Sequence, residues 1–201
     1  MNRYVDDTLA AEGLKVAMAD RSILLVAPGR SVVTERKRIG QYIDENRPLV
    51  IGVNAMVSDY TYDYVFYVNE ARYAYAFSSS RERFEAPHRI VLSNIKTEAD
   101  KGECVIAFEH AAKRGWPHYD NAVICCLRML DWLGIEEVAI AGFDGFKNIY
   151  NDSYADPTLP TLKTDGKWDE LNDEIRDMFQ EFKANATACK RITMLTESYF
   201  A

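Results

Sequence analysis

The sequence lacks long apolar runs and an excess of positive charge, and each absence excludes a class of protein. No stretch approaches the ~20 apolar residues of a membrane span, and the opening residues, Met-Asn-Arg-Tyr-Val-Asp-Asp, lack the apolar core of a signal peptide. The formal net charge of −7 disfavours non-specific nucleic-acid binding, which depends on Lys and Arg neutralising phosphates. We therefore expect a cytoplasmic protein with no membrane span and no nucleic-acid partner.

The sequence also lacks the motifs of metal centres and of the common nucleophilic enzymes. Its four cysteines include no Cys-x-x-Cys pair, and Cys125 and Cys126 lie inside an apolar helical pattern, so we expect reduced packing residues. His-Glu-x-x-His is absent, and Asp152, Asp156 and Asp165 do not have the spacing of a calcium loop. Gly-x-Ser-x-Gly and the Walker Gly-Lys-Ser/Thr are missing as well. We expect no metal and no other cofactor.

What the sequence does contain is an alternation of short apolar runs and amphipathic segments. Its 201 residues, 48% of them apolar and 27% charged, suit one well-packed soluble domain. The predicted strands span residues 23–26, 48–54, 63–69, 89–92, 104–108, 137–142 and 190–195, and the predicted helices span residues 32–46, 70–77, 120–133 and 168–188. Continuous apolar runs such as Ile23 to Val26 are typical of parallel strands buried on both faces. We predict an α/β fold with a Rossmann-like, open, mostly parallel sheet and helices on both faces.

The first residues differ from the rest because they are more polar and have no strong apolar seam. We interpret residues 1–21 as a linker or docking helix, and residues 22–201 as a single Rossmann-like nucleotide-binding domain. The sequence leaves the oligomeric state open, and a homo-oligomer is one of the alternatives.

The first strand runs into a small turn, Ala27-Pro28-Gly29-Arg30-Ser31. Gly29 allows the backbone to turn tightly and lie close to a ligand, and Ser31 stands where a helix N-cap belongs. The first amide groups of the following helix would then face the end of the strand and could hold an anion. A plain strand-to-helix turn is the alternative, because one glycine is fewer than the Gly-x-Gly-x-x-Gly fingerprint contains.

Asparagine ends the second and third predicted strands, at Asn54 and Asn69. In an open parallel sheet, ligands bind beyond the carboxyl ends of the strands, so both side chains would share a crevice with Gly29. Asparagine both donates and accepts hydrogen bonds, which suits ribose hydroxyls and the edges of bases. Ordinary turn chemistry at the strand ends is the alternative interpretation.

Two residues are candidates for a general base. Asp144 follows a buried strand within Ala-Gly-Phe-Asp-Gly-Phe, and His118 precedes a predicted helix N-terminus. Asp144 could instead cap its loop by accepting hydrogen bonds from nearby N–H groups. The long segment that follows, Lys147 to Gly166, could fold over a bound ligand as a lid.

Several of these stretches, in this order, resemble the bacterial sialyltransferases that use CMP-sialic acid, together with the related motility accessory factors and hydroxymethylpterin diphosphokinase. The matching stretches are the turn at residues 27–31, the strand-ending Asn54 and Asn69, the block from Leu133 to Asp144, and Ser153-Tyr154-Ala155. The resemblance implies a cytidine-nucleotide site made by Gly29, Arg30, Ser31, Asn54, Asn69, Asn121 and Tyr154. The family's catalytic histidine follows the Ser-Tyr-Ala segment, whereas this chain has no histidine after His118.

The stretches Ala-Pro-Gly-Arg-Ser and Asn-Glu-Ala-Arg-Tyr also resemble a domain fused behind pyruvate-aldolase-like barrels in bacterial surface-sugar loci. The resemblances together imply a CMP-sugar-like nucleotide-binding domain, glycosyltransferase-like, in bacterial surface-carbohydrate metabolism. The alternative is a non-catalytic ligand-binding or interaction domain that serves a fused or partner aldolase. Whether the chain is an enzyme stays open at this point, because the expected catalytic histidine is missing.

Overall fold

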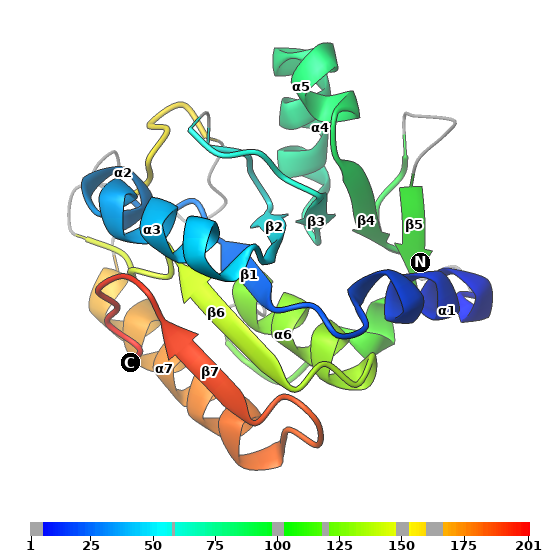
Figure 1. Ribbon diagram of the computed structural model, residues 1–201. Helices are drawn as coiled ribbons and strands as arrows, with labels where there is room; N and C mark the ends of the chain where they lie inside the picture. Colours follow the sequence, from blue (N-terminus) through cyan, green and yellow to red (C-terminus); the bar gives the residue numbers. More distant parts are fainter. Residues whose placement is uncertain (1–5, 58, 98–102, 118–120, 148–152, 160–166) are drawn as a thin grey trace.

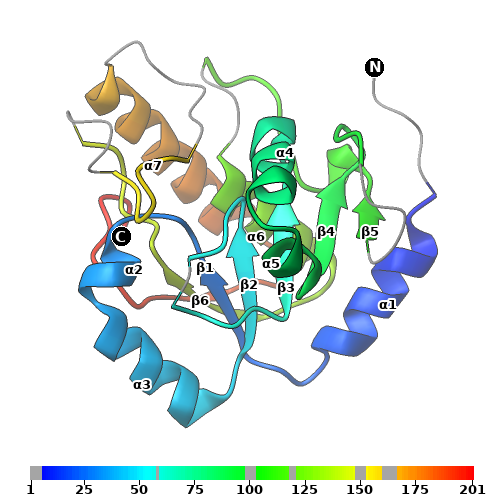
Figure 2. The same cartoon turned by 90° about the horizontal axis from the view of Figure 1, so that it is seen from above.

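The structure is a computed structural model that describes residues 6–57, 59–97, 103–117, 121–147, 153–159 and 167–201. Its centre is a sheet with the strand order β5-β4-β3-β2-β1-β6-β7, in which every neighbouring pair is parallel. The strands are β1 (Ile23–Val26), β2 (Leu49–Val53), β3 (Tyr64–Tyr67), β4 (His88–Leu92), β5 (Glu103–Ile106), β6 (Glu137–Ala141) and β7 (Arg191–Met194). Figures 1 and 2 show β1 to β5 following one another across the sheet, with β6 on the other side of β1. The predicted Rossmann-like parallel sheet is confirmed.

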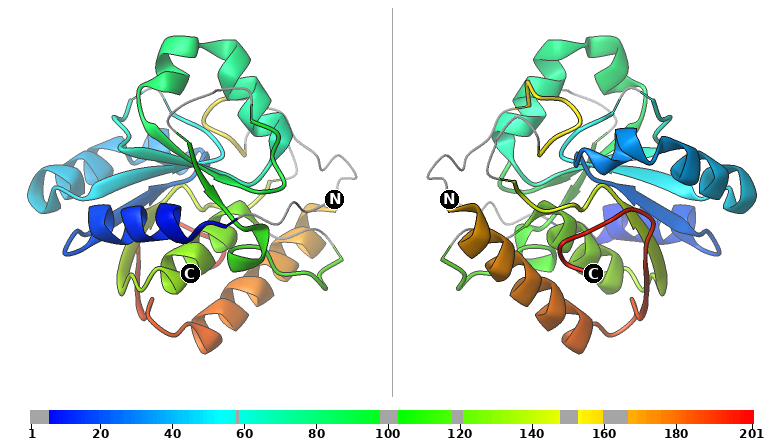
Figure 3. Two further views of the ribbon diagram at one scale, coloured as in Figure 1. Left: turned by 90° about the vertical axis from the view of Figure 1, so that its right-hand side faces the viewer. Right: turned by 90° about the vertical axis from the view of Figure 1, so that its left-hand side faces the viewer.

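Helices cover both faces of this sheet, as predicted (Figure 3). The helices are α1 (Thr8–Met18), α2 (Ser31–Thr34), α3 (Arg36–Asn46), α4 (Glu70–Ser79), α5 (Arg81–Glu85), η1 (Phe108–His110), α6 (Ala122–Trp132) and α7 (Trp168–Asn185). Ile23 and Leu25 of β1 face the larger core, which α1, α6 and α7 cover. Leu24 and Val26 face the opposite side, where α2 and α3 pack. All residues of β1 and β2 are buried because helices lie on both sides of these strands.

Some elements differ from the sequence-based expectation in their boundaries. The single helix predicted over residues 32–46 is divided into α2 and α3, because Glu35 has φ −108° and ψ 23° and interrupts the helical backbone. The polar stretch after the predicted helix 70–77 contains the additional helix α5, whose N-cap Ser80 accepts a hydrogen bond from the Arg83 amide. Asn121 caps α6 by accepting a hydrogen bond from the Val123 amide.

Helix α1 packs against the larger core rather than standing apart from it. Ala11, Leu14 and Met18 are buried among sheet and helix residues of that core. The Asp7 carboxylate just before the helix accepts a hydrogen bond of 2.8 Å from the amide of Ala107, which follows β5. Figure 1 shows α1 beside the β5 edge of the sheet. Among the described residues, no helix is long and apolar enough to cross a membrane.

The turns after β1 and β6 touch each other backbone to backbone. The Ala27 amide donates to the Ala141 carbonyl at 2.9 Å, and the Gly29 amide donates to the Gly142 carbonyl at 3.0 Å. A Cβ atom on Gly29 would lie 2.3 Å from that same carbonyl oxygen, and one on Gly142 would lie 2.2 Å from the oxygen of Ala27. Gly142 also has φ +77°, a conformation that favours glycine. Both turns therefore require glycine where they meet.

This contact makes a testable prediction about stability. Gly142→Ala should lower the free energy of unfolding by at least ~2 kcal/mol, because the added methyl meets backbone atoms and the φ angle is unfavourable for alanine. Gly40→Ala is the matched control, since nothing lies within 4 Å of its added Cβ and it sits inside α3. We expect that control to gain up to ~1 kcal/mol. Urea unfolding of the wild type and both variants measures the differences. A Gly142→Ala variant as stable as the wild type would contradict the requirement for glycine at this backbone contact.

Candidate functional site

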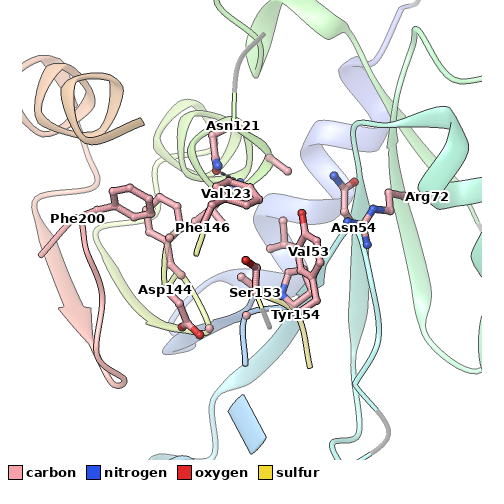
Figure 4. A pocket seen from close by; sticks show the side chains of 17 residues that line it. Val53, Asn54, Arg72, Asn121, Val123, Asp144, Phe146, Ser153, Tyr154 and Phe200 are labelled. Carbon is pink, nitrogen blue, oxygen red and sulfur yellow. Dashed lines mark hydrogen bonds between the residues drawn. The ribbon is translucent and has the colours of Figure 1, made fainter. Parts of the chain in front are cut away.

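A cavity of about 110 Å³ lies beyond the carboxyl ends of β1, β2 and β6. It sits where the strand order reverses, since the chain runs from β1 outward to β5 and then returns to the other side of β1 with β6. Ligands of open parallel sheets bind at this position. The lining residues are Ala27, Pro28, Gly29, Val53, Asn54, Arg72, Asn121, Ala122, Val123, Gly142, Phe143, Asp144, Gly145, Phe146, Ser153, Tyr154 and Phe200. Figure 4 shows Arg72 and Asp144 on opposite sides of this cavity.

The structure brings together many, but not all, of the residues that the sequence pointed to. Gly29, Asn54, Asn121, Asp144 and Tyr154 all line the cavity. Arg30, Ser31 and Asn69 are not among the lining residues. The candidate base His118 lies outside the described residues.

Asp144 is bound to the glycine turn rather than presented to the cavity as an unengaged base. Its Oδ2 atom accepts a hydrogen bond of 2.7 Å from the Ser31 amide, and its Oδ1 atom accepts one from the Ser31 hydroxyl. Ser31 is the first residue of α2, not its N-cap, and this carboxylate satisfies its amide. Asp144 thus accepts hydrogen bonds, but from Ser31 of the turn after β1 rather than from N–H groups of its own loop, as the predicted alternative had it.

Burial raises the pKa of the Asp144 carboxyl above its ordinary value, although the two hydrogen bonds from Ser31 act in the opposite direction. Lys147 also lowers this pKa, and Glu35 raises it. A carboxyl whose pKa is raised by folding stabilises the folded state below its unfolded pKa. That contribution is lost as the pH rises through the folded pKa. Ionised Asp144, above its folded pKa, therefore costs stability.

Arg72 supplies the positive charge of the cavity, from the first turn of α4. The residue is only 7% exposed, and its Nη1 atom is buried with no hydrogen-bond partner in the described parts of the chain. Its guanidinium carbon lies 4.8 Å from the centre of the Tyr154 ring. The preceding Asn69 caps the helix by accepting a hydrogen bond of 3.1 Å from the Arg72 amide. Asn69 therefore acts on the backbone that carries Arg72.

Asn54 lies on the same side of the cavity as Arg72 (Figure 4). Its backbone has φ +56°, and its amide N–H donates to the Phe66 carbonyl at 2.8 Å. Its Oδ1 atom accepts a hydrogen bond of 3.0 Å from the Val68 amide, which holds the end of β3. The Oδ1 atom is thus engaged in turn chemistry, while the Nδ2 group can donate to a ligand.

Ser153 to Leu159, the described central part of the predicted lid, joins the glycine turn to α4. Tyr154 forms an antiparallel bridge with Gly29, and the Ala155 amide donates to the Pro28 carbonyl at 2.9 Å. At the other end, the Thr158 hydroxyl lies 2.5 Å from the Tyr75 hydroxyl of α4. The segment crosses between the two sides of the cavity and places Tyr154 against Arg72.

The remaining wall is aromatic and is held from behind by α7. Asn172 of α7 accepts from the Phe146 amide and donates to the Phe146 carbonyl, both at 2.8 Å. The Phe146 ring stacks on Trp168 with a centroid distance of 5.6 Å and lies edge-on to Tyr154 at 6.1 Å. The rings of Phe200 and Phe143 pack together with their centroids 4.4 Å apart. One wall of the cavity is therefore apolar and the opposite one cationic.

Sequence reasoning missed Arg72 and Phe200. Arg72 stands three residues after the strand-ending Asn69, in the first turn of the helix that begins there, and this position is a signal that could have identified it. Phe200 had no such signal, because its place in the cavity depends on how the last residues pack beside Phe143 and Gly145. Among the described residues, no cluster of His, Cys, Asp or Glu could hold a metal ion.

The bond between Asp144 and Ser31 gives a prediction with a pH dependence. Asp144→Asn can keep both contacts and removes the buried charge, so we expect it to be at least as stable as the wild type at pH 7. Its advantage should shrink as the pH falls through the raised pKa of Asp144 toward the ordinary carboxyl value, because Asp144 then becomes neutral in the folded state. Asp144→Ala should lose about 1–3 kcal/mol, since the Ser31 amide loses its acceptor. Urea unfolding at pH 7 and near pH 4 tests this, and an Asn variant as unstable as the Ala variant would contradict it.

Comparisons of the chain with protein-family models, curated proteins and solved structures find no match. The likeness to CMP-sialic-acid-dependent sialyltransferases thus stays a prediction from sequence stretches. The geometry itself shows an α/β chain with a Rossmann-like parallel sheet and a charged, partly aromatic cavity at its switch point.

Proposed function

We propose that this chain is a cytoplasmic nucleotide- or nucleotide-sugar-binding domain of surface-carbohydrate metabolism, and that Arg72 takes the phosphate of the ligand. The observation that carries the proposal is the guanidinium of Arg72, a residue that lines the cavity and whose buried Nη1 atom has no hydrogen-bond partner among the described residues. A buried cation without a counter-charge is costly, and an anionic ligand would supply what is missing. Arginine suits phosphate because its planar fork can donate two parallel hydrogen bonds.

The other walls of the cavity fit the remainder of a nucleotide. Phe146, a half-buried residue of the cavity lining, offers apolar aromatic surface against which a planar base can pack. The Asn54 amide group and the Ser153 hydroxyl offer hydrogen bonds to polar edges, the latter while accepting from the Lys147 amide at 3.0 Å. A cavity at the switch point of a parallel sheet is the usual place for such a ligand.

The geometry favours binding over group transfer. A glycosyl transfer needs a base that removes the proton of the acceptor hydroxyl, within hydrogen-bond reach of it. Both carboxylate oxygens of Asp144 are engaged by Ser31. We therefore favour the non-catalytic version, a ligand-binding domain that serves a fused or partner enzyme such as an aldolase. A glycosyltransferase-like enzyme is the second candidate.

Arg72→Gln tests the proposed phosphate contact. The wild type should be stabilised by CMP, CDP, UDP or CMP-sialic acid in a thermal-shift assay, and affinity should fall at least about tenfold in the variant. Arg21→Gln is the control, because it removes the same charge from an exposed position before β1, at the opposite end of the strand. The proposal fails if no nucleotide raises the melting temperature at millimolar concentration. It also fails if the two variants bind alike.

A second measurement separates binding from transfer. The protein is incubated with CMP-sialic acid and a galactoside acceptor, and the released CMP is measured by chromatography. We expect binding without turnover, because no unengaged base lines the described part of the cavity. Release of CMP above the rate of a protein-free control would restore the glycosyltransferase-like candidate.

A further inference from the structure

Most amide groups at the glycine turn are already used within the protein. Gly29 donates to the Gly142 carbonyl at 3.0 Å, and Ser31 donates to the Asp144 carboxylate at 2.7 Å. The next amides, of Val32 and Val33, donate to the carbonyls of Gly29 and Arg30 at 3.3 and 3.0 Å. An anion arriving at this turn would find these donors occupied.

The Asp144 carboxylate also fills the space above the turn. A Cβ atom on Gly29 would lie 2.6 Å from its Cγ atom and 2.7 Å from its Oδ2 atom. The backbone of Asp144 is also fixed, because its carbonyl accepts a hydrogen bond of 3.0 Å from the Tyr199 amide. A phosphate could reach Ser31 only by displacing a carboxylate that is fixed on both sides and carries the same sign of charge.

The two charges of the cavity therefore divide it into unlike halves. Arg72, stacked on Tyr154, lies on one side, and Asp144, bound to Ser31, lies on the other (Figure 4). Negative charge on a ligand is attracted to the first and repelled by the second. The low-dielectric surroundings of both groups strengthen these preferences.

We propose that Asp144 is a specificity-determining residue that excludes anions from the glycine turn and confines the anionic group of the ligand to Arg72. The phosphate would then lie on the side of the cavity away from the turn after β1, whereas in the reverse orientation it would bind that turn. It favours ligands with their negative charge at one end over ligands with a chain of phosphates. The inference rests on the proposed function, in which the ligand is a nucleotide whose phosphate binds Arg72.

Inorganic phosphate tests the position of the anion without any assumption about the nucleotide. In a ¹⁵N-labelled wild-type protein, increasing phosphate should shift the Nε–H signal of Arg72 and leave the Gly29 and Ser31 amide signals unchanged. In Asp144→Asn, which removes the repelling charge, the two turn amides should begin to respond. Shifts of the turn amides in the wild type as large as that of Arg72 would overturn the inference, as would no shift at Arg72. The wild-type spectra decide this even if the variant does not fold.

A nucleotide pair then tests the selectivity. The wild type should bind CMP about tenfold more tightly than CDP, and Asp144→Asn should reduce this ratio to about twofold or less. Asp44→Asn, an exposed carboxylate in α3, is the control for the change in net charge and should keep the wild-type ratio. A ratio near one in the wild type, or an unchanged ratio in Asp144→Asn, would refute the role of Asp144 while leaving nucleotide binding intact. Conversely, phosphate shifts at Arg72 without binding of any nucleotide would refute the proposed function and leave the anion position standing.

Discussion

The close approach of two backbone turns, at Gly29 after β1 and at Gly142 after β6, is the constraint on which the rest of the site depends. A side-chain atom at either position would meet a backbone oxygen at 2.2–2.3 Å. Only because both residues lack a Cβ can the turns join and carry the pairing of β1 and β6 past the ends of the strands. The same approach puts Asp144, two residues after Gly142, within reach of Ser31. The two joined turns thus form one side of the cavity, and the Asp144 carboxylate occupies the space above the Gly29 turn.

The fold could be predicted from the sequence to a large extent, and the reason is physical. Strands buried on both faces have continuous apolar runs, and the helices between them have apolar residues at helical spacing, so each signal is local. The boundaries of α2, α3 and α5 were harder, because the break at Glu35 and the cap at Ser80 depend on backbone angles that many residues adopt. The polar first residues indicated a linker or docking helix, but not that Leu14 and Met18 would be buried in the larger core.

The site was predictable only in outline. That Gly29, Asn54 and Asp144 meet follows from the rule that parallel strands direct their carboxyl ends to one edge. The hydrogen-bond partner of each side chain depends on which residues the fold brings close, and sequence spacing does not predict this. Asp144 and Ser31 are 113 positions apart and yet form two hydrogen bonds. Arg72 was overlooked because an arginine in the first turn of a helix is usually exposed, whereas this one is buried by tertiary packing that includes Tyr154.

Whether Arg72 needs a ligand can be judged from the magnitudes of its contacts. A cation stacked on an aromatic ring gains about 0.5–2 kcal/mol. Removing a charged group from water costs several kcal/mol even after the protein relaxes, unless hydrogen bonds and a counter-charge offset it. The ring of Tyr154 therefore compensates only part of the cost, and the Nη1 atom gains nothing from a hydrogen bond within the described residues. A structural role alone would leave that deficit in place. An anion bound beside Tyr154 removes it, so the energetics of this one side chain favour a ligand site over a packing residue.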